Sequence, residues 1–345
     1  MNRLTTANLY LNPRMAILLG LGFASGLPLQ LTQDALAAWL SAADVDVTTI
    51  GLFAMVTLPY SLKFIWAPLM DRYRLPVLGR RRGWLMVTQL LLIAGIIMMA
   101  AFGPDRPYLL AIAALVVAFL SASQDIVSDA YRTDILRPRE FGAGVAMFVL
   151  GYRVALIATG AGVLMLAGFM GWRQAFILMG MLMDLGVLFT LAAKEPPQQE
   201  RTPTTITQAV VEPFQSFMAH RSWWIAGVLM LFVLIFRLPD TLGNRMTMPF
   251  LLQEMKFTPE TVGFIRQFIG IWVVIAGTFI GGWFISRIGI RAGLLIFGLL
   301  QAISNAGFLL LAWWGASQTG LVAVILIESF CGGLVTAGFL AFLMS

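Results

Sequence analysis

Residues 67–102 read APLMDRYRLPVLGRRRGWLMVTQLLLIAGIIMMAAF, a basic segment followed by an apolar run. The apolar part has about 20 residues, enough for a helix to cross a hydrocarbon layer about 30 Å thick. Of the 345 residues, 59% are hydrophobic and 12% are charged, about half the charged fraction of a soluble domain. This composition excludes a soluble globular protein, and also a disordered one, which would carry much charge and few apolar residues. The sequence therefore predicts an all-α integral membrane protein.

Ten apolar segments have the length of a membrane-spanning helix. They lie at about 15–40, 49–70, 83–103, 108–131, 141–168, 172–192, 222–243, 260–285, 293–314 and 319–343. If the N-terminus is cytoplasmic, 15 of the 23 Lys and Arg residues lie in cytoplasmic segments, 4 lie outside and 4 lie within spans. Because basic residues concentrate in cytoplasmic loops, this asymmetry predicts a cytoplasmic N-terminus.

A polar linker at 193–221 separates two groups of spans. It begins with KEPPQQERTPTT and continues with apolar residues at helical spacing, which favours a short helix on the inner membrane surface. Each group carries a charged loop after its second span, as expected for a duplicated bundle. We predict two pseudo-repeated helical bundles, with six spans in 1–192 and four spans in 222–345.

Several stretches of the chain match a known family. The loop DRYRLPVLGRRRGW (71–84) resembles the loop after the second helix in the major facilitator superfamily. The stretches GFASGLPLQLT (22–32), SASQDIVSDAYRTDIL (121–136) and ESFCGGLVTAGFLAFLMS (328–345) resemble, more narrowly, the AmpG muropeptide permeases. The resemblance extends along essentially the whole chain.

The resemblance implies import of anhydro-muropeptides, the sugar–peptide products of cell-wall turnover, across the bacterial inner membrane by alternating access. It implies coupling to the proton gradient, so the expected partners are protons, a small-molecule substrate and the lipid bilayer. It also implies at least twelve spans, so we expect a C-terminally truncated transporter. We expect a monomer that needs no cofactor or metal and binds no nucleic acid.

Ionisable residues inside the spans are candidates for the transport machinery, because a charge at the centre of a bilayer costs about 2.5–3.5 kcal/mol. Asp125 and Asp129 lie one helical turn apart, and two such close carboxylates resist double ionisation. One of them could therefore hold the transported proton. Asp34 and Glu328 are further proton-coupling candidates. The alternative for Asp129 is an ion pair with Arg132.

Polar residues in the spans are candidates for substrate binding. They are Gln30, Gln33, Asp34, Gln124, Arg153, Arg237, Asp240, Arg266 and Gln267. The spacing of Gln30 and Asp34 places them on one face of the first span. Arg153 would either pair with Asp125 or bind a substrate carboxylate, which Arg can hold with two hydrogen bonds. In the second half, Arg237, Arg266 and Glu328 would line an outward-facing cavity or form an interdomain salt-bridge gate.

The remaining charges have mainly structural explanations. Lys63 is expected to reach the headgroup region or to form a structural pair, and Asp184 is expected to be structural. The alternative to a transport role for Asp34 is a hydrogen bond between helices. The basic loop after the second span sets the topology, and by the resemblance it also latches the inner gate. The expected gating residues are Asp71, Arg72, Arg80, Arg81 and Arg82.

Other functions have weaker support from the sequence. A membrane enzyme acting on lipid-linked substrates would need a clustered acid–base or metal site in a loop, and the sequence contains none. No G-x-x-x-x-G-K-[ST] segment is present, so ATP-driven transport by this chain alone is not expected. The alternatives are a transporter of another substrate, such as an acyl-coenzyme A, a peptide or a drug-like molecule, and a non-transporting sensor or scaffold.

Overall fold

The computed structural model describes residues 10–46, 49, 53–75, 78–196, 250–257, 261–262, 264–315 and 317–344, with isolated positions 224, 227, 228, 231, 236 and 247. Within this part of the chain, eight helices are long and apolar enough to cross a membrane. They are Pro13–Ala42, Arg81–Phe102, Pro107–Ile135, Pro138–Met170, Trp172–Ala192, Gly270–Ile288, Ile290–Trp314 and Gln318–Leu343. Each corresponds to one of the ten predicted spans. Most of the predicted span 222–243 and most of the linker 193–221 lie outside the described residues.

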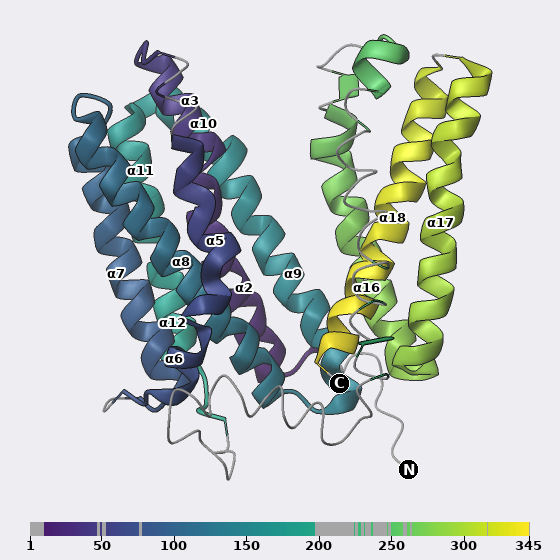
Figure 1. Ribbon diagram of the computed structural model, residues 1–345, viewed down its shortest axis with the longest axis horizontal. Helices are drawn as coiled ribbons and strands as arrows, with labels where there is room; N and C mark the ends of the chain where they lie inside the picture. The colour runs from purple at the N-terminus through teal and green to yellow at the C-terminus, as the bar shows by residue number, and fades with distance from the viewer. Residues whose placement is uncertain are drawn as a thin grey trace. The chain divides into compact units, whose positions relative to one another are not determined.

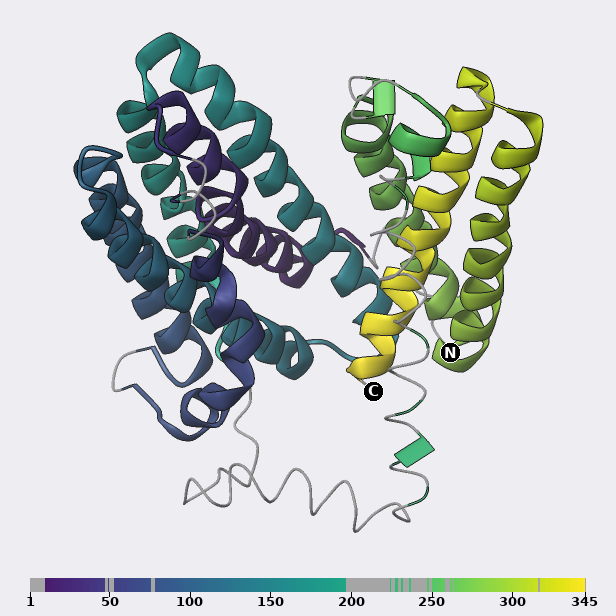
Figure 2. The same ribbon diagram turned by 45° about the horizontal axis from the view of Figure 1, so that its top comes forward.

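The helices group into two compact units. The first comprises Met1–Leu136 and Met147–Val210, and the second comprises Arg137–Ala146 and Val211–Ser345. Within each unit neighbouring helices lie side by side, as Figures 1 and 2 show for α7 (Arg81–Phe102) and α8 (Pro107–Ile135) in the first unit.

The first predicted span is two helices, α2 (Pro13–Leu31) and α3 (Asp34–Ala42). Between them the backbone of Gln33 leaves the helical region, with φ −121° and ψ −105°. Asp34 therefore starts a new helix, where the helix dipole favours an acid, and its side chain is exposed. The expectation that Gln30 and Asp34 share one helical face does not hold, because it assumed an unbroken helix.

The second predicted span, 49–70, is a series of short turns rather than one α-helix. Its described elements are η1 (Ala54–Thr57), α5 (Leu58–Leu62), η2 (Lys63–Ile65) and α6 (Ala67–Arg72). Pro59 and Pro68 lie in the first turns of α5 and α6. A proline has no N–H to continue the hydrogen bonds of a preceding helix, so each interrupts the span. Lys63 lies at the junction between the two helices.

The helices that follow α8 are α9 (Phe141–Ile157), α10 (Val163–Met170), α11 (Trp172–Leu182) and α12 (Asp184–Ala192). A π-helical turn at Ala158–Gly162 joins α9 to α10. In this turn the Thr159 hydroxyl donates to the Ala155 carbonyl, at 2.7 Å, a contact that often bends helices. Asp184 is exposed in the first turn of α12, a position that favours an acid.

Glycines let α2 approach α9 closely. A Cβ on Gly26 would lie 2.7 Å from the carbonyl oxygen of Tyr152, and a Cβ on Gly22 would also meet the α9 backbone. The two helices therefore pack backbone to backbone, as small residues allow in membrane helices. This contact places Ser25 of α2 beside the part of α9 that carries Tyr152 and Arg153.

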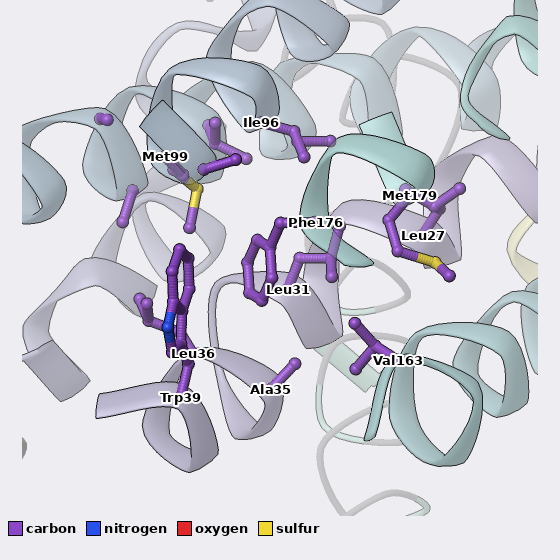
Figure 3. Packing of buried hydrophobic residues seen from close by; sticks show 14 of the residues in the cluster. Leu27, Leu31, Ala35, Leu36, Trp39, Ile96, Met99, Val163, Phe176 and Met179 are labelled. Carbon is purple, nitrogen blue, oxygen red and sulfur yellow. The ribbon is translucent and has the colours of Figure 1, made fainter. Parts of the chain in front are cut away.

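Apolar side chains from α2, α3, α7, α8 and α11 form the core of the first unit (Figure 3). Trp39 lies over Trp172, with ring centroids 6.3 Å apart and an interplanar angle of 8°. It also packs on Phe176 with a centroid distance of 4.7 Å. Leu31 and Met99 in the same cluster are fully inaccessible. This dry core holds the helices around the polar residues described below.

The second unit contains α16 (Gly270–Ile288), α17 (Ile290–Trp314) and α18 (Gln318–Leu343), which lie side by side in Figure 1. A Cβ on Gly281 would lie 3.1 Å from the Leu334 Cα, so α16 and α18 also meet at a glycine.

Candidate functional site

A polar band crosses the first unit between α2, the second span, α8 and α9. It comprises Ser25, Thr32, Tyr60, Lys63, Ser121, Gln124, Asp125, Ser128, Tyr152 and Arg153. On α8 its members are spaced by three or four residues, so they follow one helical face. Thr32 Oγ1 lies 3.5 Å from the Tyr60 hydroxyl, and the Tyr60 and Tyr152 side chains both lie near Asp125. The band thus surrounds one half-buried carboxylate.

Asp125 forms an ion pair with Lys63, with 3.8 Å between Nζ and Oδ2. The Ser25 hydroxyl also interacts with the Asp125 carboxylate. The sequence suggested Arg153 as the partner of Asp125, and that expectation is corrected. The irregular second span brings Lys63 toward α8 instead, so Lys63 forms a pair inside the unit rather than extending to the headgroups.

Asp129 has its own cation. Its Oδ1 lies 3.0 Å from Nη2 of Arg132, one turn further along α8. The Arg132 guanidinium is buried over the ring of Phe148, 4.7 Å from the centroid, whereas the Asp129 side chain is 52% exposed. The two carboxylates are therefore each paired with a different cation, and Asp129 marks the exposed end of the α8 face.

Two glutamines among the predicted substrate-binding residues have buried polar atoms without a hydrogen-bond partner among the described residues. In Gln124, which is fully inaccessible, both the Oε1 and Nε2 atoms are unpaired, and in Gln30 the Oε1 atom is unpaired. Such groups normally bind ordered water or a ligand, because an unmade hydrogen bond in the interior is costly. Both residues were predicted to bind substrate. Gln33 lies at the break between α2 and α3 instead.

Arg153 is a charged residue of the polar band that no described residue compensates. Its side chain is half-buried beside Tyr152, and it makes no ion pair with any residue that the structure describes. Arginine keeps its charge in proteins, so this guanidinium requires an anion or water. Lys63 and Asp125 balance one another, and so do Arg132 and Asp129. The polar band therefore carries one positive charge in excess.

The predicted gating loop is held by a second charge cluster. The Arg81 guanidinium donates to the Asp71 carboxylate and, through Nε at 2.8 Å, to Asp134 near the end of α8. Only 9% of the Arg81 side chain and 11% of the Asp134 side chain are exposed, whereas Asp71 is 44% exposed, so the triad has a buried centre and one exposed member. Sequence reasoning identified Asp71 and Arg81 but missed Asp134. The motif SDAYRTDIL contains Asp134, but nothing in its spacing pairs it with a loop 53 residues away.

The other predicted gating residues support the same loop. Arg80 donates to the Asp71 carbonyl at 3.3 Å, and Arg72 lies 5.2 Å from the Tyr73 ring centroid. Burial, followed by the neighbouring charge of Arg81, lowers the pKa of Arg80. Arg82 donates to carbonyls at the end of α12, including that of Leu191 at 2.8 Å.

Glu195, which sequence reasoning did not select, caps the N-terminus of α7. Its two carboxylate oxygens accept from the backbone N–H groups of Arg81 and Arg82, at 2.9 and 3.0 Å. Since Arg82 caps α12 in return, α7 and α12 cap one another reciprocally. The sequence signal was the first acid after the sixth span, at the start of a polar linker.

We expect the Glu195→Gln variant to lower the stability of the first unit by about 1 kcal/mol, because it removes the negative charge at a helix N-terminus and one of two acceptors. Thermal unfolding in detergent measures the effect as a lower midpoint. The matched control is Asp105→Asn, which removes an exposed acid that caps no helix. Equal midpoints for the two variants would contradict the capping role.

The candidates of the second half are only partly described. Glu328 is half-buried on α18, and Arg266 lies in a π-helical turn at Phe264–Ile269. Arg237, Asp240 and the side chain of Gln267 lie outside the described residues, so the cavity or gate expected there stays a prediction. Sequence reasoning missed Gln301 in α17, which is buried with an unpaired Oε1.

Comparison with known proteins places the chain in a family. The family profile described as Major Facilitator Superfamily matches residues 14–345. The anhydromuropeptide permease of Escherichia coli (strain K12) is 41% identical over 339 residues, covering 98% of this chain and 68% of that protein. The chain belongs to the AmpG-type permeases of the major facilitator superfamily.

Other relatives agree with this placement. A protein of Rickettsia felis named putative transporter AmpG 4 is 31% identical, covering 91% of this permease and 78% of its own length. A solved structure of a proton:xylose symporter of the superfamily superimposes with a TM-score of 0.66 at 12% identity, covering 97% and 81% of the two chains. At that identity the match shows the fold alone. The chain is thus a multi-span membrane transporter of a small molecule and not an enzyme.

Proposed function

We propose that this permease imports anhydro-muropeptides from the periplasm to the cytoplasm, driven by protons that move in the same direction. The observation that carries the proposal is the Lys63–Asp125 ion pair inside a membrane-spanning unit, in a relative of the E. coli anhydromuropeptide permease. Arg153 on α9 adds a cation that has no ion-pair partner among the described residues. The permease would lie in the bacterial inner membrane with a cytoplasmic N-terminus, and it would work as a monomer by alternating access.

The polar band supports an anionic sugar–peptide substrate. Arg153 can hold a carboxylate of a peptide stem with two hydrogen bonds, which is the geometry that a guanidinium favours. Gln124 and Gln30 offer unpaired amide atoms to sugar hydroxyls or peptide groups. In the second half, Arg237, Asp240, Arg266 and Gln267 would complete the substrate site.

The Lys63–Asp125 pair supports proton coupling. The Asp125 carboxylate can be neutralised either by the Lys63 ammonium or by a proton. A proton on Asp125 would release Lys63, and the polar band would then carry a larger positive charge and bind an anion more tightly. By linkage, a bound anion raises the affinity of Asp125 for a proton by the same factor as the proton raises the affinity for the anion. Proton and substrate would therefore bind together. Asp129, Asp34 and Glu328 stay secondary proton candidates.

The Asp71–Arg81–Asp134 triad supports a gate at the loop between α6 and α7. Alternating access requires contacts that form in one state and break in another, and a buried ion-pair network can switch between two arrangements. Asp134 and Asp125 both lie on α8, so a movement of this helix would act on the gate and on the polar band together.

Transport by purified permease in liposomes tests the proposal. With a more acidic exterior, we expect labelled anhydro-muropeptide to accumulate inside above its external concentration, and a protonophore to collapse the accumulation. Liposomes without protein are the control. Absence of uptake would contradict the muropeptide assignment, and acyl-coenzyme A and short peptides offered in parallel would then identify another substrate. Uptake that does not depend on the pH gradient would contradict proton coupling.

A further inference from the structure

Two buried serines lie between the Asp125 carboxylate and the exposed end of α8. Ser25 Oγ on α2 and Ser128 Oγ on α8 are 3.4 Å apart, within hydrogen-bonding reach. Ser25 is 2% exposed and Ser128 is fully inaccessible. Ser25 also interacts with the Asp125 carboxylate, so the two hydroxyls continue the polar contacts of Asp125 by one helical turn.

The path continues beyond Ser128. Arg132 lies four residues further along α8, on the same face, and is 5% exposed. Its Nε has no hydrogen-bond partner among the described residues, although Nη2 is paired with Asp129. A buried donor in polar surroundings normally binds an ordered water. Such a water beside Ser128 would connect the serine to Asp129, whose side chain is 52% exposed.

We propose that Ser25 and Ser128 carry the proton between Asp125 and a water at Arg132 and Asp129, so that α2 and α8 together form its path to one side of the membrane. This inference rests on the proton coupling proposed above. It assigns Ser25 and Ser128 a function in proton transfer, separate from substrate binding.

Each step conserves protons and charge. The protonated Asp125 donates its proton to Ser25 Oγ, while the hydroxyl proton of Ser25 moves to Ser128 Oγ. The hydroxyl proton of Ser128 moves to the water, and a proton of that water moves to the Asp129 carboxylate. Both serines end as neutral hydroxyls, and the Asp125 carboxylate regains Lys63 as its counter-ion. Arg132 keeps its charge throughout, and Asp129 releases the proton to solvent.

A purely structural role for the two serines has a different consequence. Ser25 and Ser128 would then be an interhelical hydrogen bond, and removing it would impair all transport equally. A proton path affects only the steps that move a proton. Exchange of labelled for unlabelled substrate across the membrane moves no net proton, so it separates the two roles.

The experiment compares Ser25→Ala and Ser128→Ala with the unchanged permease in liposomes that enclose a pH-sensitive dye. We expect substrate-driven proton entry to slow by about tenfold or more in each variant, because a positioned proton carrier is lost. Exchange of labelled anhydro-muropeptide should keep its rate. The Ser128→Thr variant, which retains a hydroxyl, should restore proton entry.

The matched control is Ser123→Ala. Ser123 is a buried serine of α8 that accepts a hydrogen bond from Trp66 Nε1 at 3.0 Å and makes no hydrogen bond with Asp125 in the described part of the chain. Its loss should leave proton entry unchanged. Unchanged proton entry in Ser25→Ala and Ser128→Ala would overturn the path, as would an equal loss of exchange and proton entry. If the unchanged permease exchanges substrate but moves no proton, the proton coupling itself is wrong.

Discussion

In the Asp125→Asn variant, uphill accumulation of substrate is expected to disappear while exchange across the membrane continues. Asparagine keeps the shape of the side chain but cannot take up a proton. The polar band then has no group at position 125 that could carry the proton down its gradient. It also leaves Lys63 without its counter-ion, 3.8 Å away in the unchanged permease. The expected internal substrate concentration then equals the external one at every pH gradient.

Two transport assays on the same liposomes measure this effect. One follows accumulation under an imposed pH gradient, and the other follows exchange of labelled for unlabelled substrate. The matched control is Asp105→Asn, which removes an acid whose side chain is 84% exposed and lies 3.7 Å from Arg173. This control should accumulate substrate like the unchanged permease. Persistent uphill accumulation in Asp125→Asn would show that another group carries the proton.

A double variant separates the loss of a proton carrier from the loss of an ion pair. An unpaired charge inside the unit can disturb packing, and Asp125→Asn leaves one at the half-buried Lys63. The Asp125→Asn/Lys63→Met protein has neither charge. If accumulation failed only because of the unpaired ammonium, the double variant would regain it. We expect it to remain uncoupled, because the titratable carboxylate is still absent.

The membrane-spanning helices could be predicted wherever a long run of apolar residues indicates one. The spans near α7, α8, α17 and α18 appear within a few residues of their predicted bounds, because about 20 apolar residues in lipid must form a continuous helix. The breaks inside spans were not predicted. The series of turns around Pro59 and Pro68 depends on which backbone groups find partners in neighbouring helices, and hydropathy does not contain that information.

The candidate site, like the fold, could be predicted only in part from the sequence. Asp125, Gln124 and Arg153 could be identified because polar residues inside apolar spans are rare. Their partners could not, since Lys63 reaches Asp125 only through the irregular second span. Ser25 and Ser128 carry no signal of their own, because serines also pack between membrane helices. Their significance comes from the close approach of α2 to α8, which is a tertiary property.

The placement of Asp125 and Asp134 on one helix connects the polar band with the proposed gate. Nine residues of α8 separate them, which corresponds to about 13 Å along the helix axis. Asp134 is held by Arg81, and Asp125 by Lys63. Both residues lie within one continuous helix of 29 residues, so a tilt of α8 would move both. One movement of α8 could therefore break the Lys63–Asp125 pair and weaken the Arg81–Asp134 pair together.

Replacing Arg153 by Gln is expected to weaken binding of a substrate with a free carboxylate by about 10- to 100-fold, since hydrogen bonds to a charged group contribute about 1.5–3 kcal/mol. Glutamine keeps polarity and much of the length but loses the charge and the two parallel donors. Because Arg153 pairs with no acid among the described residues, the change leaves no buried carboxylate unpaired. The loss therefore reports on the ligand.

A chemical double-mutant cycle isolates the contact between Arg153 and the carboxylate. Binding of anhydro-muropeptide and of the same molecule with amidated stem carboxylates is measured by calorimetry, for the unchanged permease and for Arg153→Gln. Amidation should weaken binding to the unchanged permease and have little further effect on the variant. Arg173→Gln, which removes a half-exposed arginine 3.7 Å from Asp105, is the matched control and should bind both ligands normally. If the two ligands lose affinity equally in Arg153→Gln, the guanidinium does not bind the stem carboxylate.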